Sequence, residues 1–477
     1  MANRYFLNIG ANWGDTANWS DTSGGTGGFS VPTNADDVFF DANSGNCTVN
    51  ASNRVAKTLD FTGYTNTITM TFGITVSGSV TLVAAMTIAG ASGLTINATG
   101  TFTSNGKTWP NALTFSATNT LTLADDLSVG GLLTTSGGTT TVNGTFNINA
   151  SGGITISANL VQGIGTTTLN LTGGTWSGGG VVRINTNLNG NVIISGTVWF
   201  DTRTLTHLSG NITTSGSILR SLANVTYNTG SVVWNNITFD NLTYTLLSDL
   251  NINGNIGTLG TVTFNGTFNI NSSGTFNIGN TIQQGTGVTT LNLLGGTWST
   301  TSANGILRLN TNINGNITIS GNVYYNTGTL TNLSGKTNAN TATLNIAASS
   351  TFINCDKINF KTITITAATT QTFNRFFSGS ALVPTRIQSG TAGTNYTITF
   401  QDRFEKITKF TKISNCTVTN RGQLLCITDK SNKGGNVGVR YINQMPNGLP
   451  KNNPSTTNPL GYATSTYLLS DPNTILI

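Results

Sequence analysis

Charged residues are scarce in this sequence. Only 8% of its 477 residues are Asp, Glu, Lys or Arg, against about 25% in an ordinary globular protein. Glutamate occurs once, at Glu405, and the other strong helix formers are few, which excludes a helical protein. Because 37% of the residues are hydrophobic and so few are charged, the composition is also the opposite of that of a disordered chain.

Proline, cysteine and long apolar runs are scarce as well. Eight prolines and no Gly-X-Y period exclude collagen. The apolar run from Leu82 to Met86 is far too short to cross a bilayer, so we expect no membrane insertion. Four cysteines are too few for a disulfide scaffold, and their spacing fits no zinc motif. The sequence therefore predicts no metal and no cofactor.

The cysteines themselves are interpreted as packing residues. Cys47, Cys355 and Cys416 each follow an asparagine in similar strings, which is typical of a small apolar residue at an inward strand position. A bridge between Cys416 and Cys426 stays open as an alternative, but it would require an oxidising compartment.

The abundant residues are Thr, Asn, Ser and Gly, and they occur in a long internal repeat. Residues 143–176 recur at 265–298, and residues 181–210 recur at 306–335. With a weaker match upstream, a unit of about 125 residues occurs twice over roughly 105–353. Such self-similarity is typical of stacked repeat architectures.

Within each repeat the pattern is one of short strands and corners. Residues 362–366 read Thr-Ile-Thr-Ile-Thr, and such alternation predicts a half-buried strand. Thr suits strands, and Asn can stack in ladders with Asn of the next coil. We therefore expect an all-β fold, a β-solenoid, as a right-handed β-helix; a tandem array of β-sandwiches is the alternative. Asn-Gly pairs are expected at corners, where they supply positive φ, at Asn143-Gly144, Asn189-Gly190, Asn253-Gly254 and Asn314-Gly315.

Three segments follow from composition. Residues 1–52, with Trp13 and Trp19, are expected to cap the solenoid and attach it, since an open coil end exposes unpaired backbone groups. Residues 53–399 are expected to form the solenoid rod. Residues 400–477 are expected to form basic C-terminal coils and an arm rich in Pro and Asn. The net charge of +6 is concentrated toward this end.

Strings near both ends resemble known proteins. Asn18-Trp19-Ser20, followed by residues 31–38 with the sequence VPTNADDV, resembles the opening of bacterial surface β-helix proteins and of phage virion proteins. Residues 426–437 are similar to the last coil of such phage proteins. The resemblance implies a phage fibre, spike or head appendage. The opening residues contain no conventional secretory signal, so we expect assembly in the host cytoplasm and a place in the virion, with the bacterial cell surface as the alternative.

No catalytic residue is predicted. Asp201, Asp240 and Asp249 are the only acids between 127 and 353, whereas a solenoid hydrolase needs paired carboxylates. His207 is the only histidine, and a Ser-His-Asp triad would combine it with Asp201 and Ser209. The second repeat has Asn332 at that position, which argues against a triad.

Tryptophan and arginine recur together in the repeat. Trp176 precedes Arg183 in the first copy, and Trp298 precedes Arg308 in the second. On an exposed face, such a ring can stack on a sugar and the guanidinium can make paired hydrogen bonds to it. The other interpretation is a tryptophan packed inside a coil and a solvated arginine. The four residues are thus candidate glycan contacts.

The function expected from these features is structural or adhesive rather than enzymatic. The expected partners are other virion proteins, a host surface polysaccharide and further copies of the chain, with a homotrimer as our hypothesis. Nucleic acid is not expected, because the basic residues are dispersed. A polysaccharide-degrading tailspike enzyme and a bacterial adhesin are the alternatives. Ice binding would need Thr-x-Thr in register on every coil, and the string at 362–366 does not recur at fixed spacing.

Overall fold

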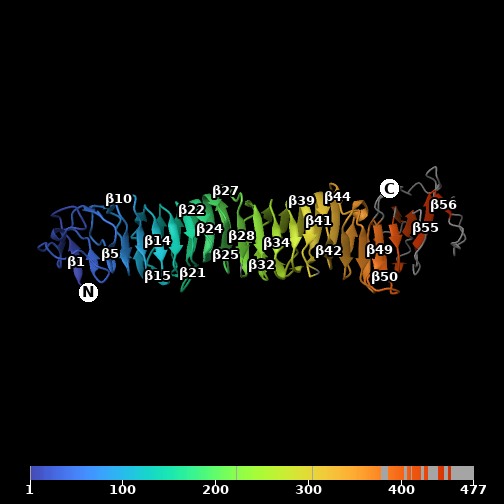
Figure 1. The fold of residues 1–477 in the computed structure, drawn as a ribbon, viewed down its shortest axis with the longest axis horizontal. Helices are drawn as coiled ribbons and strands as arrows, with labels where there is room; N and C mark the ends of the chain where they lie inside the picture. The colour runs from blue at the N-terminus through green and yellow to red at the C-terminus, as the bar shows by residue number, and fades with distance from the viewer. Residues whose placement is uncertain are drawn as a thin grey trace. The chain divides into compact units, whose positions relative to one another are not determined.

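The described chain is a β-solenoid in which parallel coils are stacked on one another (Figure 1). It makes about 18 turns and is 1% helical. It divides into two compact units, Met1–Asn236 (unit 1) and Ile237–Ile477 (unit 2). The computed structural model describes residues 2–221, 223–302, 304–375, 377, 385–401, 406–409, 411–419, 424–427, 439–444 and 450–452.

A coil in unit 1 consists of three short strands joined by corners. One coil contains β14 (Leu113–Ser116), β15 (Asn119–Leu123) and β16 (Leu127–Val129). The next coil begins with β17 (Leu133–Ser136), which pairs in parallel with β14. Alternate residues of β14 are buried, so the period-two pattern of the sequence marks the inward face, as predicted.

The two sequence repeats fold alike, strand for strand. In unit 1, β22 (Thr168–Ser177) pairs with β24 (Asn185–Ile194) across a register shift between Leu171 and Gly173. In unit 2, β39 (Thr290–Thr300) pairs with β41 (Asn310–Ile319) across the equivalent shift between Leu293 and Gly295. The repeat therefore encodes not only strands but also the same bulge, which lets one long strand continue from one coil face to the next.

Two of the four Asn-Gly pairs are not corners, and that prediction was wrong. Gly144 lies at a corner with φ of 121°, and Asn253-Gly254 lies in a bend. Gly190 and Gly315, however, lie inside the long strands β24 and β41. A Cβ on Gly190 would meet the carbonyl oxygen of Thr172 on the preceding coil. Glycine is required there for space between backbones rather than for positive φ.

Asparagine ladders join the coils of unit 2, as the sequence predicted. Asn271 donates its amide to Asn251 at 2.8 Å, and Asn292 donates to Asn271 at 2.7 Å. Asn312 continues the series by donating to Asn292 at 2.9 Å. Because each amide both donates and accepts, the ladder satisfies polar groups that the coil stacking partly buries.

The first residues of unit 1 form an aromatic cluster under the first coils. Trp13 and Trp19 are fully buried and contact each other edge to face at a ring-centroid distance of 5.0 Å. Phe40 packs against both of them. β1 (Asn3–Phe6) pairs with β3 (Asp37–Phe39) in parallel and with β2 (Trp19–Ser20) in antiparallel fashion. These side chains supply the apolar area that a coil end needs.

Asp36 bonds within this segment, and Asp37 joins it to the next coil. Asp36 accepts hydrogen bonds from the backbone N–H of Ala2 and of Thr33, and from the Thr33 hydroxyl at 2.7 Å. Asp37 accepts from the Thr58 hydroxyl and pairs with Lys57. Burial by itself would raise the pKa of Asp36, but these hydrogen bonds together with the charge of Arg4 hold that pKa below its ordinary value.

This arrangement predicts an acid-sensitive N-terminal segment. A carboxyl whose pKa is lower in the folded than in the unfolded chain stabilises the fold above about pH 4, and this contribution is lost as pH falls through the folded pKa. Asp36→Asn is expected to cost about 2 kcal/mol in unfolding free energy at pH 7, since hydrogen bonds to a charged group are lost. The difference from wild type should shrink at pH 2.5. Urea unfolding followed by circular dichroism at both values measures it, and an equal loss at both would contradict the interpretation.

The cysteines mostly occupy inward positions. Cys47 and Cys416 are buried in strands β4 (Cys47–Thr48) and β53 (Cys416–Thr419), and Cys355 is buried in the short helical turn Cys355–Lys357 rather than in a strand. Burial raises the pKa of Cys416 to about 12, which keeps the thiol protonated. The alternative bridge to Cys426 is not tested, because the side chain of Cys426 lies outside the described residues.

The C-terminal end is described only in part. Strands β54 (Leu424–Ile427) and β55 (Val439–Gln444) pair in parallel, so coil-type pairing continues beyond residue 400. β56 (Pro450–Asn452) then pairs with β55 in antiparallel fashion. The rest of the C-terminal arm, which is predicted within residues 400–477, lies outside the described residues.

Candidate glycan-binding face

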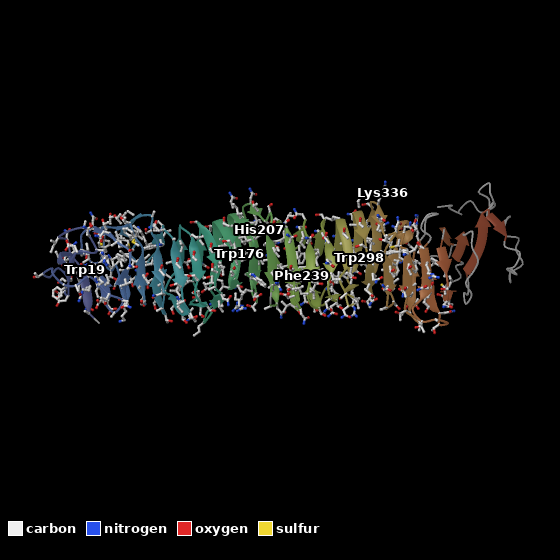
Figure 2. All side chains as sticks on the ribbon, in the orientation of Figure 1. Trp19, Trp176, His207, Phe239, Trp298 and Lys336 are labelled. Carbon is white, nitrogen blue, oxygen red and sulfur yellow. The ribbon has the colours of Figure 1, made fainter. Side chains whose placement is uncertain are left out.

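The two tryptophans singled out from the sequence are core residues. Trp176 and Trp298 are 0% exposed and occupy the same slot in the two repeats. Trp176 lies between Ile154 and Ile194 of the neighbouring coils. Figure 2 shows both rings within the body of their units, whereas Lys336 projects from the edge of unit 2. Neither ring offers a surface to a sugar, so the packed interpretation holds for both.

A different tryptophan lies on the outer face of unit 1. Trp199 in β25 (Thr197–Phe200) is half-buried, while its neighbours Val198 and Phe200 are fully buried. In the next coil Arg220 lies opposite Trp199 in register. The guanidinium carbon of Arg220 lies 4.5 Å from the centre of the Trp199 ring, which is a cation–π contact.

Arg183, one of the predicted residues, lies beside this tryptophan. On β23 (Val181–Arg183), Val181 faces Trp199 in register, and Arg183 is two residues further along the same outward side. The Nε of Arg183 lies 3.3 Å from a carboxylate oxygen of Asp201. That carboxylate is 1% exposed. In unit 1 the charge of Arg183 is therefore matched by the protein itself.

Unit 2 repeats this face with several substitutions. Tyr324 in β42 (Asn322–Tyr325) stands where unit 1 has Trp199, and it faces Ile306 in register. Arg308 stands where unit 1 has Arg183, and both Arg308 and Tyr324 are half-buried. The partners differ, since Asn326 replaces Asp201 and Asn345 replaces Arg220. Each unit thus presents an aromatic ring diagonal to an arginine on a neighbouring strand.

Hydroxyl groups form regular columns on other strands. In unit 1, five threonines from successive coils lie in register, and Ser177 continues the column; they are Thr75, Thr95, Thr114, Thr134 and Thr155. In unit 2, a Thr-x-Thr pair recurs in register on three coils, at 370–372, 397–399 and 417–419. A search for fixed spacing misses these columns, because the coils differ in length and parallel pairing restores the register.

His207 and its sequence neighbours do not form a triad. The ring of His207 bonds to the Ser231 hydroxyl and, through Nε2, to the carbonyl of Gly210 at 3.1 Å. Ser209 donates instead to Asn189 at 2.8 Å, and Asp201 pairs with Arg183. The hydrogen bonds of all three groups hold coils together.

Most of the other acids have similar tasks. Asp126 accepts from the backbone N–H of Asn147 at 2.8 Å, and Asp249 accepts from that of Asn269 at the same distance in unit 2. Among the residues that the structure describes, no group of three or more His, Cys, Asp or Glu side chains could hold a metal ion. No helix in the described part of the chain is long and apolar enough to cross a bilayer.

Comparison with known proteins adds no relative. The chain matches no family model, no curated protein and no solved structure. The candidate face consists of Trp199 with Arg183 in unit 1 and of Tyr324 with Arg308 in unit 2.

Proposed function

We propose that this chain is a non-enzymatic structural and adhesive protein of a phage particle that binds a host surface glycan. The observation that carries the proposal is the duplicated outward pair of an aromatic ring and an arginine. Such a ring stacks on the C–H face of a sugar, and the guanidinium donates to sugar oxygens. Carbohydrate binding of this kind gains strength from repetition of weak sites.

Several features favour adhesion over cleavage. Acids of the described coils bond to backbone groups, as Asp126 and Asp249 do, or pair with a basic side chain, as Asp201 does. Acid–base cleavage of a glycosidic bond needs two carboxyl groups facing one sugar. The outer surface instead carries columns of hydroxyl and amide groups. The virion assignment rests on the resemblance of residues 18–20 and 31–38 to phage proteins, and a homotrimer remains our hypothesis.

The face makes a direct binding prediction. Trp199→Ala and Tyr324→Ala are each expected to weaken binding to a purified envelope polysaccharide of the host by about fivefold to tenfold, because each removes one stacking ring worth roughly 1 kcal/mol. Equilibrium binding of the fluorescently labelled polysaccharide measures the change. Phe72→Ala is the control, since Phe72 is also an exposed aromatic residue at 41% exposure but lies outside the face.

The same incubation tests the absence of turnover. We expect bound polysaccharide of unchanged length and no new reducing ends. New reducing ends that disappear when a single aspartate is replaced would establish the tailspike-enzyme alternative. Labelling of intact phage particles with an antibody raised against the chain tests the virion assignment, and unlabelled particles would refute it.

A further inference from the structure

We propose that the face of unit 2 is specific for an acidic glycan, and that Arg308 receives the carboxylate of a uronic acid while Tyr324 carries the sugar ring. The inference rests on the proposed glycan binding and goes further, since it assigns the charge of the ligand and the unit that binds the charged group. It follows from a comparison of the two faces within one chain.

Both arginines of the unit 1 face are engaged within the unit. Arg183 is paired with the buried carboxylate of Asp201 at 3.3 Å, and Arg220 lies over the ring of Trp199 at 4.5 Å. The charge of Arg183 is thus matched by a carboxylate, and the guanidinium of Arg220 covers one side of the aromatic ring on which a sugar would stack.

Unit 2 leaves the equivalent arginine with its charge unmatched. Leu307 faces Tyr325 in register, which places Asn326 beside Arg308 as Asp201 is beside Arg183. Asn326 is neutral, and its oxygen accepts from the backbone N–H of Ala347 at 2.7 Å. Among the residues that the structure describes, Arg308 forms no ion pair, and its side chain is half-buried. A half-buried guanidinium with no carboxylate beside it is a strong site for a ligand carboxylate.

The ring of Tyr324 favours a sugar acid over an inorganic anion as the ligand of Arg308. Asn345 replaces the arginine that covers the aromatic ring in unit 1. Tyr324 therefore has no such cation over it, and it lies diagonal to Arg308 on the next strand. A ring diagonal to a guanidinium on the adjacent strand can hold a sugar whose own carboxylate reaches that guanidinium. An inorganic anion would gain nothing from Tyr324.

The test compares uronate polymers with their neutral forms. Polygalacturonate, alginate and hyaluronan are each paired with the same polymer after reduction of its carboxyl groups to alcohols. We expect wild type to bind at least one polyuronate about tenfold more tightly than its reduced partner, the size of one charge-assisted hydrogen bond at a half-exposed site. Arg308→Gln should remove that preference, whereas Lys336→Gln, which removes an exposed cation of unit 2 outside the face, should change it by less than twofold.

Asn326→Asp is the sharper variant, because it copies Asp201 into unit 2. Its carboxylate can still accept from Ala347, so the fold is kept, and it should pair with Arg308 and abolish the preference for the acidic polymer. Circular dichroism and the binding of the reduced polymers should be unchanged.

Each remaining outcome counts against the inference. The inference would be overturned if wild type bound no polyuronate more tightly than its reduced form. It would also be overturned if the preference for the acidic polymer survived Asn326→Asp. Loss of binding upon adding phosphate, with no loss in Tyr324→Ala and no preference among the sugars, would assign a plain anion site instead. If the reduced polymers bind and lose affinity in Trp199→Ala and Tyr324→Ala, glycan binding stands while the acidic specificity falls. If neither form of any polymer binds, the proposed function falls with it.

Discussion

Trp176→Ala is expected to lower the free energy of unfolding by about 3–5 kcal/mol, because truncation of a fully buried tryptophan leaves a large cavity. The ring is 0% exposed and lies edge to face with Phe200 at 6.4 Å. Trp298 occupies the same slot, edge to face with Tyr325 at 6.4 Å, so Trp298→Ala should cost a similar amount. Denaturant unfolding followed by circular dichroism measures both.

Two controls separate burial from residue type. Trp199→Ala removes a half-buried ring and its contact with Arg220, and it should cost about 1 kcal/mol. Trp176→Phe keeps an aromatic ring in the slot and loses no hydrogen bond, since the indole N–H of Trp176 is buried without a partner. It should therefore cost much less than Trp176→Ala. Equal losses for Trp176→Ala and Trp199→Ala would contradict the assignment of inner and outer faces.

Gly190→Ala is the second substitution with a large expected effect, a loss of about 3 kcal/mol. The added Cβ would meet the carbonyl oxygen of Thr172 in the preceding coil, and Gly315 has the same relation to Leu294 in unit 2. Because the obstacle is backbone rather than a flexible side chain, two coils would have to move apart. Thermal and denaturant unfolding of Gly190→Ala and Gly315→Ala measure the loss.

The matched control is Gly179→Ala in the same unit. Nothing lies within 4 Å of a Cβ at Gly179, so this variant should be neutral or stabilise the chain by about 0.5 kcal/mol through the unfolded state. If Gly190→Ala proved as stable as Gly179→Ala, the close backbone approach at the bulge would not be a constraint on the sequence.

The candidate site was only half predictable. Arg183 and Arg308 were recognised because they are equivalent in the repeat, and both lie on the outer face. Trp176 and Trp298 are candidate sugar contacts by sequence because they recur before the two arginines, yet they are core residues. The sequence does contain an indication that Trp199 faces outward. Trp199 is two residues from the polar Thr197, so both point to the same face of the strand, and Tyr324 has the same relation to Asn322. This indication was obscured because Trp199 is flanked by apolar residues on both sides.

The sequence by itself determined the all-β class, the repeat and the coil, because period-two alternation and β-branched composition act locally and recur along the chain. Tertiary structure alone decided three further features. Parallel pairing aligned threonines such as Thr75, Thr95 and Thr114 across coils of unequal length. Close backbone packing at the bulge placed two Asn-Gly pairs, at Gly190 and Gly315, inside strands rather than at corners. The register between neighbouring coils placed a carboxylate beside Arg183 but an amide beside Arg308, because a charge is matched only by the residue that the adjacent coil presents.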